Sequence, residues 1–96
     1  MELRQIQYFI EAAKLEHVTE ASYALHVSQS AVSRQIFKLE AELGVDLFVH
    51  EGRKVKLTPI GRQFLQHMEQ MMKVLEQARQ EINEYLDPER GTVRIG

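Results

Sequence analysis

The chain has 96 residues, of which 44% are hydrophobic and 27% charged, a formal net charge of -2, and no cysteine. This length allows one small core and one protruding element but excludes two conventional domains. Without cysteine there are no disulfides or thiolate metal sites, which fits a reducing cytoplasm. Because the apolar runs are short and the first residues form a polar, amphipathic segment, we expect a soluble cytoplasmic protein with no membrane partner and no secretory leader.

Hydrophobic periodicity predicts three helices in the first half of the chain. The first covers residues 3–15, with an apolar stripe formed by Leu3, Ile6, Phe9, Ile10 and Ala13. Thr19 is placed to cap a short second helix, whose buried side carries Ala21, Ser22 and Leu25. Ser28 is placed to cap a third helix that ends at Gly44. The buried seam of this third helix consists of Val32, Ile36, Leu39 and Leu43.

A hairpin and a long helix are predicted after Gly44. Residues 47–49 and 54–57 have the composition of two short strands, the second alternating basic and apolar, joined across Glu51 and Gly52. Thr58 as the cap and Pro59 at the first helical position then open the long helix.

The segment 19–36 has the residue spacing of a helix-turn-helix. This motif needs a small residue where its two helices cross, and Ser22 supplies it. The three apolar positions that follow are Leu25, Val27 and Val32. His26 falls at the tight turn, where a left-handed backbone is needed, and histidine is among the non-glycine residues enriched there. A generic helical hairpin is the alternative, but the agreement of caps, small residue and apolar positions favours the helix-turn-helix.

The third predicted helix presents a polar and basic face opposite its buried seam. The outward side chains are Ser30, Ser33, Arg34 and Lys38, with Gln29 at the exposed amino-terminal end. A helix amino-terminus favours phosphate, glutamine pairs with adenine, and arginine pairs with guanine. We therefore interpret this face as a reader of the DNA major groove. For any single residue, an ordinary solvated helix face remains the alternative. We expect Phe37, at the edge of the face, to pack against a neighbouring element rather than against a thymine methyl group.

Basic residues also gather in the predicted hairpin. The net charge of -2 argues weakly against nucleic acid, but residues 26–38 and 52–62 contain basic side chains and no acidic ones. Arg53, beside the turn, is placed to enter a narrow minor groove, where negative potential is enhanced. Lys54 and Lys56 are placed to neutralise phosphates. The alternative is a solvated hairpin edge that its lysines protect from aggregation.

Beyond Pro59 the apolar residues follow heptad spacing. They are Phe64, Met68, Met71, Leu75, Ala78, Ile82 and Tyr85, and Leu65, Met72 and Leu86 widen the stripe. A single helix with so wide an apolar face needs a partner, so the pattern predicts a homodimer that pairs through this helix.

Residues 3–61 resemble the DNA-binding domain of the LysR-type transcriptional regulators. The motifs that match are Leu-Arg-Gln-Ile-Gln-Tyr-Phe from residue 3, Leu-His-Val-Ser-Gln-Ser-Ala-Val-Ser-Arg-Gln-Ile from residue 25, Leu39-Glu40, Leu43-Gly44, Leu47-Phe48 and Leu57-Thr-Pro-Ile-Gly61. These matches run in register through most of the chain, which makes the resemblance specific.

The resemblance implies a mainly α fold in three parts. Residues 1–58 would form a winged helix-turn-helix, 59–86 a dimerising linker helix, and 87–96 a hinge and the truncated start of an effector-binding domain. By motif position, Gln29, Ser30, Ser33 and Arg34 match the groove-facing residues of the family and Arg53 matches its wing contact. His50 stands where the family commonly has arginine, so the contact there is expected to be weaker or sensitive to pH.

The resemblance also implies a function. It predicts a bacterial regulator, cytoplasmic and associated with the nucleoid, that binds double-stranded DNA at interrupted palindromes in promoter or operator regions. The full-length protein would be a tetramer built from dimers. A small-molecule effector would bind only to the domain that is missing here.

Catalysis is not expected. The histidines His17, His26, His50 and His67 have no spacing that would gather a metal ion, and the sequence has no glycine-rich phosphate loop. We therefore expect no catalytic residues, no metal site and no cofactor. The main competing function is a protein-docking module. The polar and basic face of the third helix favours DNA over that alternative, with Phe37 as the one residue against it.

Overall fold

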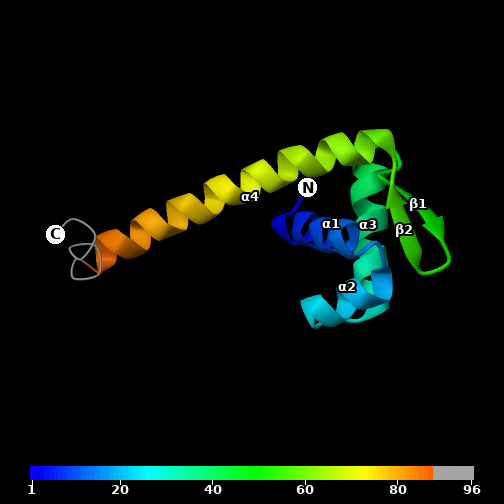
Figure 1. Ribbon diagram of the computed structural model, residues 1–96, viewed down its shortest axis with the longest axis horizontal. Helices are drawn as coiled ribbons and strands as arrows, with labels where there is room; N and C mark the ends of the chain where they lie inside the picture. Colours follow the sequence, from blue (N-terminus) through cyan, green and yellow to red (C-terminus); the bar gives the residue numbers. More distant parts are fainter. Residues whose placement is uncertain (88–96) are drawn as a thin grey trace.

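A computed structural model describes residues 1–87 of the chain, and within them it has four helices and a two-stranded sheet. The elements are α1 (Leu3–Leu15), α2 (Val18–Leu25), α3 (Gln29–Leu43), β1 (Phe48–Glu51), β2 (Lys54–Leu57) and α4 (Pro59–Leu86). Helices α1 to α3 and the hairpin form a body at one end, and α4 leaves it as a long rod (Figure 1). This confirms the predicted winged helix-turn-helix with a long last helix. Apart from Asp87, the hinge and the start of an effector-binding domain that are expected at residues 87–96 lie outside the described residues.

The core lies where α1, α3, β1 and α4 meet. The ring of Phe9 is fully buried, and its centroid is 5.3 Å from the ring centroids of both Phe48 and Phe64. One aromatic residue of α1 therefore links the wing to the long helix. The largest other fully buried side chains are Val32, Ile36, Leu39, Leu47 and Val55.

The predicted apolar stripes need two adjustments. In α1, Leu3 is exposed, whereas Gln5 and Tyr8 are buried. In α2 and α3, Leu25 and Leu43 are half-buried and pack at the margin of the core. Leu3, Leu25 and Leu43 lie at the ends of their helices, where fewer neighbouring elements are present to cover them.

The start of α2 differs from the prediction, because His17 rather than Thr19 caps the helix. The Nδ1 atom of His17 accepts the N–H of Glu20 at 3.2 Å. The N–H of Val18 donates to the carbonyl of Arg53 at 2.9 Å, which fixes the beginning of the helix against the wing. The other predicted ends are confirmed: Ser28 caps α3, and His26 adopts the left-handed conformation with φ of 60°.

The wing is an antiparallel hairpin with a two-residue turn. Phe48 lies opposite Leu57 and Glu51 opposite Lys54, so Gly52 and Arg53 form the turn. Gly52 has φ of +65°, a conformation that glycine adopts without steric cost. Strand β1 begins one residue later than predicted and extends to Glu51. Leu47 lies outside it, because Leu47 is buried and a side chain of α3 takes its N–H.

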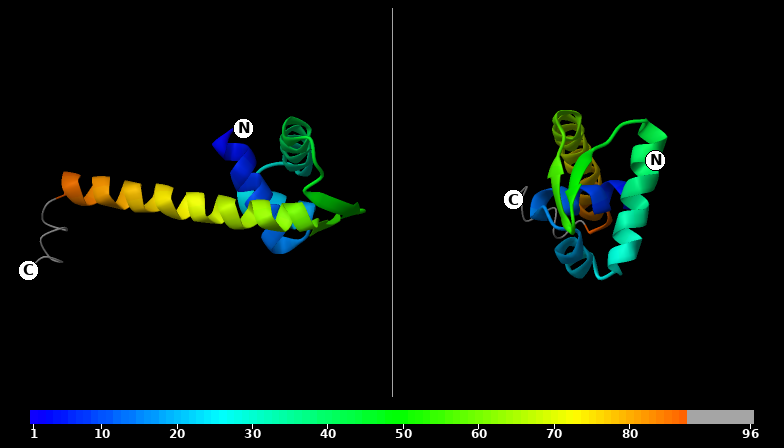
Figure 2. Two further views of the ribbon diagram at one scale, coloured as in Figure 1. Left: turned by 90° about the horizontal axis from the view of Figure 1, so that it is seen from above. Right: turned by 90° about the vertical axis from the view of Figure 1, so that its right-hand side faces the viewer.

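The corner between the wing and α4 is closely packed. Thr58 caps α4: its hydroxyl accepts the N–H of Gly61 at 3.0 Å and donates to the carbonyl of Asp46 at 2.7 Å. Gly61 lies directly against the carbonyl of Leu47, and a Cβ at that position would be 2.1 Å from its oxygen. These contacts set the direction in which α4 leaves the body (Figure 2). No helix within residues 1–87 is both long enough and apolar enough to span a membrane.

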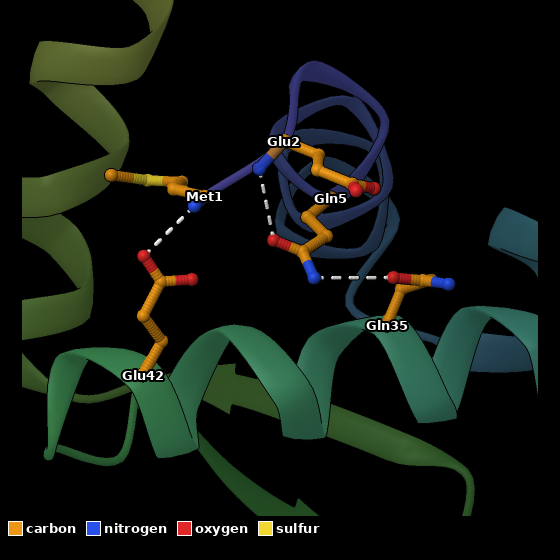
Figure 3. A network of polar contacts seen from close by, with 5 residues as sticks. All are labelled: Met1, Glu2, Gln5, Gln35 and Glu42. Atoms are coloured by element: carbon orange, nitrogen blue, oxygen red, sulfur yellow. Dashed lines mark hydrogen bonds and ion pairs between the residues drawn. The ribbon is translucent and has the colours of Figure 1, made fainter.

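A chain of polar contacts joins the amino-terminal end of α1 to α3 (Figure 3). The side chain of Gln5 donates to Gln35 at 3.2 Å and accepts the N–H of Glu2 at 3.1 Å. The amino group of Met1 pairs with Glu42 at 2.8 Å. Because these bonds hold α3 from its inner side, the opposite face of the helix is free to meet another molecule.

Candidate nucleic-acid interface

The outer face of α3 forms one open depression. Its lining consists of Gln29, Ser30, Ser33, Arg34, Phe37, Lys38 and Ala41. Helical geometry places residues four apart above one another, so these side chains form two adjacent rows. All five residues predicted to read DNA from this helix therefore lie together, and none of the lining residues is acidic.

Gln29 is held in place by a contact that the sequence analysis missed. The hydroxyl of Thr19 donates to Oε1 of Gln29 at 3.1 Å, and the Gln29 side chain is half-buried instead of fully exposed. The carbonyl oxygen of an amide has a second lone pair, and its NH₂ group donates two hydrogens. Gln29 thus keeps both the acceptor and the donor that pairing with an adenine edge needs. The only signal of this contact in the sequence was Thr19, which lies three residues before Ser22, the small residue where the two helices cross.

The amino-terminal end of α3 is a second polar feature. The hydroxyl of Ser28 accepts the N–H of Ala31 at 3.1 Å and lies 3.2 Å from the hydroxyl of Ser30. Unpaired amides at this end carry the positive end of the helix dipole, which favours an anion such as a phosphate.

The charges of Arg34 and Lys38 are not neutralised by ion pairs within residues 1–87. Both side chains are exposed, and in the part of the chain that the structure covers neither has an acidic partner within ion-pair distance. Both cations are therefore available to an external anion or to a base edge.

The three basic residues of the wing are exposed but do not all lie on one surface. Arg53 is at the turn. Lys54 and Lys56 line a separate hollow that also includes Glu16 and Glu20, so acidic groups weaken the positive potential there. Figure 1 and the right-hand view of Figure 2 place the turn of the wing at the same end of the body as the amino-terminal end of α3. Arg53 is thus the wing residue that is best placed to act together with α3.

The position of the wing is fixed by two backbone hydrogen bonds to the junction of α1 and α2. Val18 donates to the carbonyl of Arg53 at 2.9 Å, and Val55 donates to the carbonyl of Glu16 at 3.1 Å. Sequence periodicity gives no sign of such contacts, because they use backbone atoms only. They hold the turn at a fixed distance from the helix-turn-helix.

Phe37 packs against a neighbouring element, as predicted, but only in part. Its side chain is 55% exposed. Its ring contacts His50 of β1 along one side, with 5.4 Å between centroids and an angle of 33° between the planes. The contact with β1 therefore leaves more than half of the Phe37 side chain exposed.

The predicted dimerisation seam on α4 divides into two parts. Phe64 and Met68 pack against the core of their own chain. From Met71 onward the seam moves away from the body: Ile82 is 58% and Tyr85 83% exposed. Leu75 is half-buried and Ala78 is exposed. Of the seven seam residues, Phe64 and Met68 are the two that pack against the core of their own chain, and both are half-buried there.

Metal chemistry finds no support in the described residues, where no group of three or more metal-ligating side chains comes together. His17 is used as a helix cap and His50 packs against aromatic rings.

Comparison with protein families matches residues 3–62 to the bacterial regulatory helix-turn-helix proteins of the lysR family. Among curated relatives, the transcriptional dual regulator GltC of Bacillus subtilis is 60% identical over 96 residues, which are 100% of this chain and 32% of that protein. The HTH-type transcriptional regulator TfdS of Cupriavidus pinatubonensis is 46% identical over 74 residues, or 77% of this chain and 25% of that protein. The chain spans about a third of the length of the first of these relatives.

Solved structures agree with the family match. The DNA complex of the CbnR DNA-binding domain has a TM-score of 0.83 and 34% identity, over 90% of this chain and 99% of that one. The complex of the BenM DNA-binding domain with the catB site 1 DNA has a TM-score of 0.86 and 33% identity, over 91% and 97%. Both the fold and the sequence of the helix-turn-helix are thus shared. The chain belongs to the lysR family of bacterial regulatory helix-turn-helix proteins, whose members among its relatives are transcriptional regulators and not enzymes.

Proposed function

We propose that this chain binds double-stranded DNA with sequence specificity, as the DNA-binding portion of a bacterial LysR-type transcriptional regulator. The observation that carries the proposal is the outer face of α3, where Gln29, Ser33 and Arg34 line one open depression with no acidic residue. Such a helix fits the major groove, where arginine recognises guanine and glutamine recognises adenine. Structural relatives at 33 to 34% identity were solved as DNA complexes, which supports the same use of the fold here.

In this proposal the wing adds contacts to the DNA backbone. Arg53, at the turn, enters the adjacent minor groove, and Lys54 and Lys56 neutralise phosphates. The backbone bonds from Val18 and Val55 to the wing support this arrangement, because a turn held at a fixed distance from α3 contacts the duplex without an added ordering cost.

The exposed seam on α4 supports a homodimer. Two copies paired through Met71, Leu75, Ala78, Ile82 and Tyr85, with Phe64 and Met68 at the start of the seam, would hold two α3 helices at a fixed separation. A twofold dimer reads a palindromic site, whose half-site spacing follows from that separation. Residues 1–58 then act as the reader, 59–86 as the linker and 87–96 as the hinge. The full-length regulator would assemble as a tetramer, bind its effector through a further domain, and work in the cytoplasm on nucleoid DNA.

Selection of bound sequences from a pool of random duplexes tests the proposal. We expect enrichment of two inverted half-sites at a constant spacing when the selection is made at a stated, moderate salt concentration. The Arg34→Ala chain, selected in parallel, should return a weaker preference at one position of each half-site. A pool that stays random after selection, at a salt concentration where the chain still binds duplex DNA, would refute sequence-specific recognition.

A protein-docking function is the competing proposal. It requires an apolar or acidic outer face on α3, whereas five of the seven side chains in the depression are polar or basic. The other two are Phe37 and Ala41, and of these Phe37 is the large one.

A further inference from the structure

Phe37 is a large apolar side chain in the middle of a polar recognition surface. It lines the depression together with Ser33, Arg34 and Lys38, and more than half of its surface meets solvent. An exposed ring of this size is costly in water unless a partner covers it. The body of the protein covers it only in part, because the side chain stays 55% exposed although His50 lies beside the ring.

The geometry directs this ring outward. Phe37 lies one helical turn beyond Ser33, about 6 Å further along the axis of α3. His50 stands beside the ring at 5.4 Å and is itself backed by Phe48 at 6.4 Å. The ring meets the wing on one side and also lines the depression, so part of its exposed surface opens on the same depression as Ser33 and Arg34.

The charges around Phe37 indicate which partner covers it. Arg34 and Lys38 are exposed on either side of it along the helix, and neither has an ion-pair partner among residues 1–87. A partner that meets this surface must therefore present negative charge around a small apolar group. The DNA major groove has this combination, because phosphates border it and the 5-methyl group of thymine is the apolar group on a base edge.

We infer that Phe37 is a specificity-determining residue that contacts the 5-methyl group of a thymine, with His50 as the residue that positions its ring. The inference rests on the proposed function, since it needs α3 in the major groove. It adds an apolar contact to the polar contacts of Gln29 and Arg34, and it assigns a thymine to the part of each half-site that lies nearest the middle of α3.

Deoxyuridine substitution tests the inference, because deoxyuridine lacks only the methyl group of thymine. The probe is the duplex that is most enriched by the wild-type 96-residue chain, remade with each thymine replaced in turn by deoxyuridine. At one position in each half-site, the wild-type chain should bind about fourfold more weakly, which is the value of one buried methyl group. The Phe37→Ala chain should bind the duplex with thymine at that position and the duplex with deoxyuridine there equally well.

Tyr23→Ala is the matched control, because Tyr23 is an aromatic side chain of α2 that is 73% exposed and lies outside the depression. This chain should keep the fourfold discrimination. For the positioning role, His50→Ala should reduce the discrimination and His50→Phe should restore it, with unfolding midpoints unchanged. If His50→Ala and the wild type distinguish thymine from deoxyuridine by the same factor, His50 does not position the ring.

The outcomes separate this inference from the proposed function. If the wild-type chain selects a site but every deoxyuridine substitution affects the wild type and Phe37→Ala alike, the inference fails and the proposed function stands. A selected half-site without thymine also overturns the inference. If the wild-type chain selects no sequence, the proposed function fails.

Discussion

The carboxylate of Glu40 accepts the N–H of Leu47 at 2.8 Å, and the same oxygen accepts the N–H of Phe48 at 3.1 Å. Glu40 lies near the carboxyl end of α3 and is only 8% exposed. These bonds join the recognition helix directly to the residues that lead into the wing. The two elements that are proposed to contact DNA are therefore held together by one buried acidic side chain.

Replacing Glu40 with alanine should destabilise the chain by ~1 to 3 kcal/mol, because two backbone N–H groups would be left buried without acceptors. Urea unfolding measures this loss. Glu42→Ala is the matched control: Glu42 pairs with the amino group of Met1 at the surface. An exposed pair of this kind contributes less than about 1 kcal/mol. Equal losses in the two variants would contradict the role assigned to Glu40.

Gly61→Ala should also destabilise the fold, for a steric reason. The added Cβ would lie 2.1 Å from the carbonyl oxygen of Leu47, so either α4 or the residues before β1 must move. Overpacking of this kind costs about 1 to 3 kcal/mol. Thermal unfolding should show a clear loss for Gly61→Ala, while Gln63→Ala, an exposed change in the same turn, stays within about 0.5 kcal/mol of the wild type. If Gly61→Ala is as stable as Gln63→Ala, the backbone at Leu47 and Gly61 can move apart at little cost in stability, which contradicts the prediction.

Periodicity predicted the elements of this fold because local features define their ends. Ser28, Gly44 and Thr58 lie at the predicted boundaries, and the buried faces of Val32, Ile36 and Leu39 follow from helical spacing alone. The errors arose where a distant partner decides the outcome. Residues 47–49 have the composition of a strand, but Glu40 takes the N–H of Leu47 and the strand begins one residue later.

The candidate site could be predicted in composition but not in arrangement. Helical spacing was enough to bring Gln29, Ser33 and Arg34 to one face. The position of Thr19 in the sequence did not show that it holds Gln29, because the two residues meet only once α2 and α3 cross. The exposure of Phe37 was missed for the same reason, since it depends on how far β1 extends over α3.

Arg34→Ala should relax base discrimination at one position of each half-site and cost ~1 to 3 kcal/mol of specific binding. Arg34 is exposed and has no ion pair within residues 1–87, so folding should be unaffected. Fluorescence anisotropy with a set of single-base variants of the selected site measures the change. Arg34→Lys is the control, because it keeps the charge but loses the two-point contact with guanine, and it should also lose discrimination. If Arg34→Ala ranks the single-base variants by affinity in the same order as the wild type, Arg34 does not contact a base.

Lys54→Ala should weaken binding to all sequences to a similar extent and lower the slope of log K against log salt by about one unit, because a phosphate contact carries no sequence information. Salt titrations with one specific and one unrelated duplex measure both effects. Lys73→Ala removes the same charge from an exposed position on α4, away from the wing, and should leave the slope unchanged. A loss confined to the specific duplex would assign Lys54 to base recognition instead.

Leu75→Asp should convert the proposed dimer into monomers, because a carboxylate in the middle of the heptad seam would be buried against its own counterpart. Leu75 is half-buried in the single chain. Sedimentation velocity measures the assembly state, and binding to paired half-sites should weaken more than binding to one half-site. Gln80→Asp introduces the same charge on the opposite face of α4, where the native side chain is exposed, and should remain a dimer. If Leu75→Asp sediments as an intact dimer, α4 does not pair through this seam, and another surface must set the distance between the two recognition helices.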